Sequence, residues 1–122
     1  MDKGQALQTF WASFGLPAYE QGTVPDDAVM PYITYNVAFG NFDSTVTLNA
    51  DLWYRSKAWK DADKKTEQIS QAIGRRGYET RIDGGYLWIK KQMPRFSEHA
   101  TDPDDMVRRV RLFIEADFLT EN

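Results

Sequence analysis

The stretch TVTLNADLWYRS, residues 45–56, decides the fold class. Apolar and polar residues alternate along it, which is the pattern of a β-strand with one buried face. About 12 residues at about 3.3 Å each predict a strand roughly 40 Å long, about twice the usual length. The face predicted to be buried carries Val46, Leu48, Ala50, Leu52 and Tyr54, and the opposite face carries Thr45, Thr47, Asn49, Asp51, Trp53 and Arg55.

Three further stretches alternate in a similar way. Residues 31–39 precede the long strand across a Gly-Asn turn signal, so the two are predicted to form a β-hairpin. Residues 78–92 predict a second hairpin around Asp-Gly-Gly, because Asp-Gly supplies the positive φ angles of tight turns. The closing strand is predicted to place Val110, Leu112, Ile114, Ala116 and Phe118 on its buried face and Arg109, Arg111, Phe113, Glu115 and Asp117 on its outer face.

Two segments have the apolar spacing of amphipathic helices. The first is ended by Gly15 and Pro17, and the second is expected to run from a Ser56 cap to Gly74. Residues 16–31 and 94–105 are rich in Pro and Asp and are predicted to be connecting loops. The predicted buried positions are Leu7, Phe10, Trp11 and Phe14 in the first helix and Trp59, Ala62, Thr66, Ile69 and Ile73 in the second.

These segments predict one α+β domain over residues 1–122 with the element order αββαβββ. We expect two helices packed on one face of a largely antiparallel sheet, a common layered architecture. A chain of 122 residues is long enough to bury a core of its own.

Composition excludes several classes of function. The chain has no cysteine, which rules out disulfides, thiolate catalysis and Cys-ligated zinc. A net charge of −3 disfavours binding to a nucleic-acid backbone. No apolar run approaches the roughly 20 residues of a membrane helix, and the first residues lack the apolar region of a signal peptide. We therefore expect a soluble protein that is not exported.

The candidates for chemistry are weak. His99 lies in a polar stretch and is interpreted as a solvated loop residue. Asp102, Asp104 and Asp105 lack the EF-hand spacing and are interpreted as turn formers. The Gly84-Gly85 pair has no phosphate-loop pattern. We therefore predict no catalytic residue, no cofactor and no metal site, and a protein that is not an enzyme.

The outer face of the closing strand is the unusual feature, because it mixes an aromatic residue with charges of both signs. Such a surface is typical of protein–protein contacts. Its arginines are interpreted as partners for salt bridges between protomers, in preference to stacking with nucleic-acid bases. The predicted interface residues are Arg95, Phe96, Arg109, Arg111, Phe113, Glu115 and Asp117.

From about residue 5 to 118 the chain resembles the tail terminator, or tail completion, proteins of long-tailed bacteriophages. The resemblance is carried by PYITYNV (31–37), by TVTLNADLWYRS leading into AWKDADKKTEQISQAI (45–73), by GGYLWIKK (84–91) and by DDMVRRVRLFIEADF (104–118). It implies an α+β fold and a homo-oligomeric ring, usually a hexamer. Such a ring assembles in the bacterial cytoplasm, caps the tail tube, ends its polymerisation and binds the head connector in the virion, without a cofactor.

Two alternatives stay open. One is a related neck or head–tail joining protein. The other is a small-molecule binding or enzymatic domain of the cone-shaped α+β kind, with Asp51 as the base. Asp51 is predicted on the less apolar side of its strand, which disfavours the enzyme.

Overall fold

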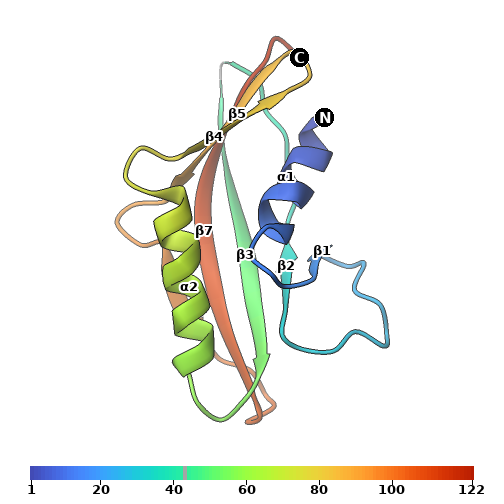
Figure 1. Ribbon diagram of the computed structural model, residues 1–122, viewed down its shortest axis with the longest axis vertical. Coiled ribbons are helices and arrows are strands. Elements are labelled where there is room, and N and C mark those ends of the chain that lie inside the picture. The colour runs from blue at the N-terminus through green and yellow to red at the C-terminus, as the bar shows by residue number, and fades with distance from the viewer. Residues whose placement is uncertain (43) are drawn as a thin grey trace.

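Two long antiparallel strands, β3 (Thr45–Arg55) and β7 (Val107–Leu119), form the centre of the fold (Figure 1). The computed structural model describes residues 1–42 and 44–122. The long strand expected at residues 45–56 is present as β3. The other elements are α1 (Lys3–Ala12), β1 (Ala18–Glu20), β2 (Tyr32–Tyr35), α2 (Lys60–Ile73), β4 (Tyr78–Ile82), β5 (Gly85–Lys91) and β6 (Ser97–Ala100).

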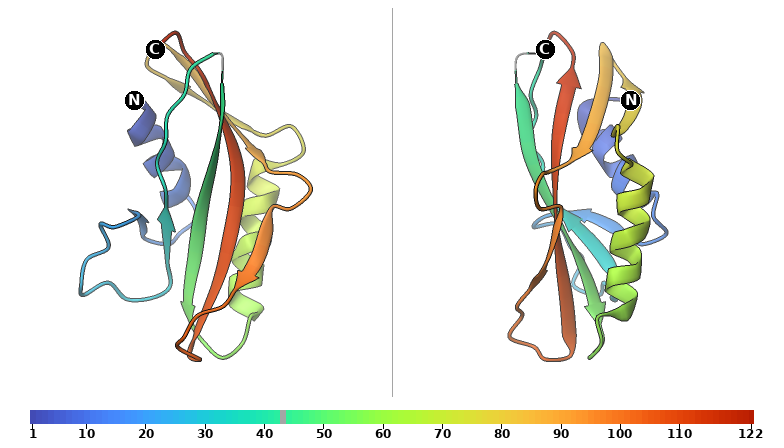
Figure 2. Two further views of the ribbon diagram at one scale, coloured as in Figure 1. Left: turned by 180° about the vertical axis from the view of Figure 1, so that it is seen from behind. Right: turned by 90° about the vertical axis from the view of Figure 1, so that its left-hand side faces the viewer.

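The described residues form one seven-stranded sheet in the order β1-β2-β3-β7-β5-β4, with β6 also pairing with β7. The first half of β7 pairs with β6 and the second half with β5, so β7 is hydrogen-bonded along both edges. The β1–β2 pairing is parallel and the other pairings are antiparallel. Figure 2 shows that the sheet is twisted and curled, which gives it an inner and an outer side.

The predicted fold class is wrong in its element order and in its simple layering. The observed order is αβββαββββ, and the sheet curls into a half-barrel. Only α2 lies along the central strands, where it contacts β3, β5 and β7. Helix α1 contacts β1 and β4, which are the outermost strands of the sheet order, so α1 fills the opening of the curl. A flat sheet would have placed the two helices side by side.

The missing strands lie inside the segments that were predicted to be loops. β1 lies within residues 16–31 and β6 within residues 94–105. Both are short and neither alternates between apolar and polar residues. β1 forms by pairing with the edge of β2, and β6 forms by pairing with the edge of β7. Sequence periodicity does not reveal such pairings. The strand expected to continue to Phe39 ends at Tyr35.

The helices begin for different reasons. Asp2 caps α1, because its carboxylate accepts from the backbone N–H of Gln5 at 2.7 Å and the Gln5 side chain accepts from the Asp2 N–H at 2.9 Å. Ser56 does not cap α2 as expected; its hydroxyl oxygen accepts from the N–H of Ala58 instead. Trp59 precedes the helix, and its side chain makes no capping hydrogen bond. Neither helix in the described residues is long and apolar enough to cross a membrane.

The inner side of the sheet is filled by the apolar stripes of both helices. Leu112 and Trp11 are 0% and 1% exposed, and burial of each such side chain contributes about 1.5–3 kcal/mol. Trp59 is an exception, because it is only partly buried. Residues predicted to pack together and found buried in one cluster are Leu7, Phe10, Trp11, Phe14, Leu48, Leu52, Ile69, Ile73, Leu112 and Ile114.

Candidate docking surface on the outer face of the sheet

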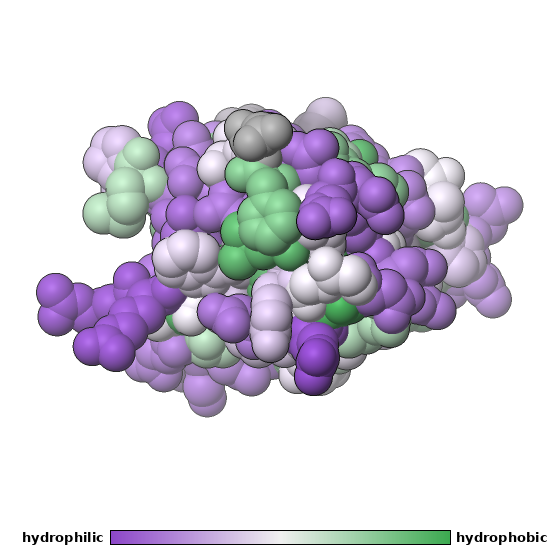
Figure 3. All heavy atoms as spheres, turned by 90° about the horizontal axis from the view of Figure 1, so that it is seen from above, coloured by the Kyte–Doolittle hydropathy of each residue, from purple (hydrophilic) through white to green (hydrophobic). Residues whose placement is uncertain are grey.

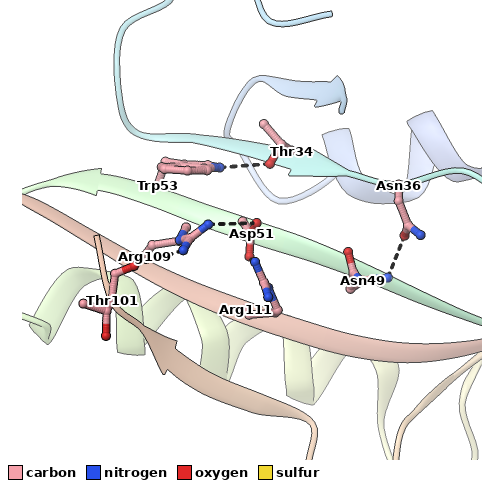
Figure 4. Close-up of polar contacts among 8 residues, drawn as sticks. All are labelled: Thr34, Asn36, Asn49, Asp51, Trp53, Thr101, Arg109 and Arg111. Atoms are coloured by element: carbon pink, nitrogen blue, oxygen red, sulfur yellow. Dashed lines mark hydrogen bonds and ion pairs between the residues drawn. The ribbon is translucent and has the colours of Figure 1, made fainter. Parts of the chain in front are cut away.

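The outer face of the sheet carries a charged cluster at the centre of β3 and β7. Arg111 Nε donates to Asp51 Oδ1 at 3.1 Å, and Arg109 Nη1 lies 3.8 Å from Asp51 Oδ2 (Figure 4). The register makes this possible by placing Asp51 directly opposite Arg111. We call these three residues the Asp51 network.

Trp53 and its neighbours shield this network from water. The Arg109 guanidinium lies over the Trp53 ring at 5.0 Å, and Trp53 Nε1 donates to the Thr34 hydroxyl at 2.9 Å. A third contact runs from Arg109 Nη2 to the carbonyl oxygen of Thr101 at 3.0 Å. Asp51 is consequently only 9% exposed although it lies on the outer face. A carboxylate buried to this extent is stable because it accepts a charge-assisted hydrogen bond from Arg111 and forms an ion pair with Arg109.

A second network lies near the other end of β7. Asp117 accepts a hydrogen bond from the Thr45 hydroxyl at 2.6 Å and pairs with Lys90 Nζ at 2.9 Å. Burial by itself would raise the pKa of Asp117. The Thr45 hydrogen bond and the Lys90 ammonium outweigh that effect and hold the pKa below its ordinary value. The Lys90 ammonium also lies 4.5 Å from the centre of the Trp88 ring.

Between the two networks lies a more apolar region at Phe113. The guanidinium of Arg95 lies 5.3 Å from the Phe113 ring centre, and Arg95 also pairs with Glu98 at 3.1 Å. The chain after β5 crosses the sheet here on its way to β6, and its Met93 side chain is 76% exposed. A depression of about 280 Å³ is lined by Gln92, Met93, Pro94, Arg95 and Phe113.

The seven predicted interface residues therefore divide into groups. Arg109, Arg111 and Asp117 are paired within the chain, which leaves them less available for salt bridges between protomers than the sequence suggested. Phe96 packs against the core. The remaining three stay on the outer side, and Glu115 forms no ion pair with any described residue. We call Met93, Arg95, Phe113 and Glu115 the outer patch.

Sequence reasoning missed Met93 as a surface residue. The available signal was an apolar residue beside a proline in a polar connection, since such a side chain has no strand or helix face to bury it. The same reasoning misplaced His99, which lies in β6 rather than in a solvated loop. Its ring stacks on Trp59 with centres 3.6 Å apart, and its Nε2 lies 2.8 Å from Asp63 Oδ1. His99 thus attaches β6 to α2.

A second exposed apolar surface lies at the end of the molecule where β3 begins and β7 ends. Phe39 and Phe42 are 54% and 59% exposed, and Figure 3 shows hydrophobic surface gathered at this end. Both residues contact the end of β7 and the residue after it. The Phe39 and Phe118 rings pack edge to face with their centres 5.8 Å apart, and the Phe42 N–H donates to the carbonyl of Thr120 at 3.1 Å. We call Phe39 and Phe42 the end patch.

The aspartates near residue 104 are engaged in local turns. Asp102 accepts from the N–H of Asp104 at 3.0 Å, and Asp104 accepts from the N–H of Met106 at 2.9 Å. Asp104 also lies 3.6 Å from Arg55. In the described part of the chain, no group of three acidic or histidine side chains is placed to hold a metal ion.

No family model, curated protein or solved structure matches the chain. The patches lie on different sides of the molecule, one on the outer face of the sheet and one at its end.

Proposed function

We propose that this protein is a structural component of a bacteriophage or prophage that caps the tail tube as a homo-oligomeric ring, most simply a hexamer. The ring ends polymerisation of the tube and then binds the head connector. Assembly takes place in the bacterial cytoplasm, and the ring stays at the tail–head junction of the virion. Its partners are further copies of itself, the tail-tube protein and the connector protein.

The observation that carries the proposal is the presence of two separate surface patches on one small domain. Met93, Arg95, Phe39 and Phe42 are exposed, and Phe113 and Glu115 are half-buried. A ring subunit needs lateral contacts to its neighbours and axial contacts to the tube or connector. The outer patch combines an aromatic ring, a methionine and an arginine, which are residue types enriched in protein interfaces. The end patch presents two phenylalanines in a different direction. We assign lateral contacts to the outer patch and axial contacts to the end patch.

The proposal assigns no catalytic role to any residue. Asp51, the carboxylate suggested as a base in the enzyme alternative, lies on the outer face between two arginines. Its carboxylate accepts a hydrogen bond from Arg111 and forms an ion pair with Arg109, so it is already engaged by two cations of its own chain. This geometry favours a structural role for Asp51.

The direct test uses the tail-tube protein encoded by the same genome, polymerised in vitro. We expect the wild-type protein to form a ring at one end of each tube and to stop further elongation, as seen by negative-stain electron microscopy. Binding to the connector alone would instead support the related neck-protein alternative. A wild-type protein that stays monomeric at high concentration and binds neither partner would overturn the proposal.

A second test places the lateral contact. Phe113→Ala should weaken self-assembly more than Glu115→Ala, because a desolvated aromatic ring contributes more affinity than a charge at the rim. Light scattering at high concentration measures assembly, and circular dichroism checks that both variants are folded. Equal assembly of Phe113→Ala and wild type would contradict the assignment of the outer patch while leaving the ring itself possible.

A further inference from the structure

A basic pocket lies where α2 ends beside β5. It has a volume of about 480 Å³ and is lined by Gly74, Arg75, Lys90, Lys91, Met93 and Glu115. Three of the lining residues are cationic and one is anionic. Lys91 donates to the Ser70 hydroxyl at 3.0 Å and Lys90 pairs with Asp117, whereas Arg75 is exposed and contacts no described carboxylate. The pocket therefore has a surplus of positive charge.

The opposite charge is concentrated in residues 102–105, Asp-Pro-Asp-Asp, which we call the acidic loop. Asp104 and Asp105 are exposed. The Asp104–Arg55 contact at 3.6 Å is a surface pair, and such pairs hold their partners weakly. Asp105 uses its backbone carbonyl to accept from Arg108, and its carboxylate forms no ion pair with a described residue. The loop thus presents free negative charge.

A protomer does not fill its own pocket with its own loop. The loop ends two residues before Val107, the first residue of β7, and the pocket includes Glu115, eight residues further along this strand. At about 3.3 Å per residue these positions are roughly 26 Å apart. Figure 1 shows the start of β7 at the end of the molecule away from β4 and β5. The two surfaces can meet only between molecules.

We propose that the basic pocket of one copy binds the acidic loop of a second copy. This inference rests on the proposed ring and identifies one of its lateral contacts. A pocket and a loop at different ends of the subunit make a head-to-tail contact, the type that generates a ring when the rotation between neighbouring copies closes. The pocket shares Met93 and Glu115 with the outer patch, so both contribute to one interface.

The natural absence of cysteine permits site-specific cross-linking. Met93→Cys in the pocket and Pro103→Cys in the loop keep every charge of the two surfaces. Mixing these two proteins with a short bis-maleimide should give a covalent dimer, and neither protein alone should do so above background. A chain with both substitutions should give a ladder of higher oligomers. Glu20→Cys, an exposed position on β1, replaces Met93→Cys in the control mixture and should not cross-link to Pro103→Cys.

Charge reversal tests the chemistry of the contact. Arg75→Glu or Asp105→Arg, introduced separately beside the cysteines, should each reduce the cross-linking yield about tenfold, because like charges then meet. Mixing a pocket protein that carries Arg75→Glu with a loop protein that carries Asp105→Arg should restore the yield. High salt should lower the wild-type yield, since screening weakens exposed charge pairs.

The outcomes separate this inference from the proposed function. If the wild-type protein forms rings on tail tubes but the Met93→Cys and Pro103→Cys proteins do not cross-link, the pocket–loop contact is overturned and tube capping stays intact. A cross-link that is insensitive to both charge reversals would also overturn the proposal, because charge complementarity would then play no part. A chain that binds no tube but cross-links as expected would support the contact and overturn tube capping.

Discussion

The inner and outer faces of β7 are made by alternate residues of one strand, yet their roles differ. Every inner residue from Val110 to Phe118 is at most 1% exposed, so this face stabilises the fold through burial. The outer face holds two charged networks, around Asp51 and Asp117, and between them Phe113 and Glu115 lie without a charged network of their own. Alternate residues of one strand therefore differ: the inner residues stabilise the fold through burial, whereas Phe113 and Glu115 take part in no charged network.

The largest expected effect is on the inner face. Leu112→Ala should lower the free energy of unfolding by about 2–5 kcal/mol, because it leaves a cavity in a closely packed core. Urea denaturation followed by circular dichroism measures the change. Thr47→Ala, at an exposed position of β3, is the matched control and should change stability by less than about 0.5 kcal/mol. Similar losses for both variants would contradict the division between the faces.

A smaller loss is expected in the paired part of the outer face. Asp51→Ala should cost about 1–3 kcal/mol, because Arg109 and Arg111 would keep their partly buried positions without a counter-charge. Asp51→Asn retains a hydrogen-bond acceptor and should cost less. The same denaturation experiment compares the two variants. An unchanged stability for Asp51→Ala would show that water replaces the carboxylate without loss.

The contacts of Asp117 with Thr45 and Lys90 should make the stability of the fold depend on pH. The pKa of Asp117 is lower in the folded chain than in the unfolded chain, so the carboxylate stabilises the fold above its unfolded pKa of about 3.9. That stabilisation is lost as the pH falls through the lower, folded pKa. The difference in melting temperature between wild type and Asp117→Asn should therefore shrink from pH 6 to pH 3. A difference that stays constant over this range would contradict the assignment.

The smallest effect on stability is expected at Glu115, which lies between the charged contacts of Asp51 and those of Asp117. Glu115→Gln should change the free energy of unfolding by less than about 0.5 kcal/mol, because no described residue pairs with its carboxylate. Thermal denaturation in dilute solution, where copies do not associate, isolates this effect. A loss above about 1 kcal/mol would mean that this region also stabilises the isolated subunit.

The sequence predicted features that depend on local periodicity. The alternation around Leu48 and Leu112 identified both long strands and their buried faces, and the stripe at Phe10 and Trp11 identified a buried helix face. The pairing of Asp51 with two arginines could not be predicted, because it depends on β3 and β7 being neighbours in a particular register. Because this register is not visible in the sequence, Arg109 and Arg111 were interpreted as partners for salt bridges between protomers.

The curl of the sheet could not be predicted from the sequence either. It arises from the accumulated twist of neighbouring strands and from the placement of α1 between β1 and β4, which lie far apart in the sequence. β1 and β6 were missed because three or four residues are too few to establish a period. His99 is exposed as expected, but its contacts with Trp59 and Asp63 were missed because these residues belong to a segment about 40 residues earlier.

The central position of β7 has a consequence for the order of folding. β7 is the last of the described strands to be synthesised, yet β3, β5 and β6 all pair with it. Until β7 leaves the ribosome, β3, β5 and β6 lack their common partner strand. The edge of β3 that pairs with β7 in the folded chain is then unpaired. Closing the sheet then requires contacts between residues as distant as Thr45 and Asp117. Such distant contacts slow folding, so we expect the sheet to close only after translation has passed residue 119.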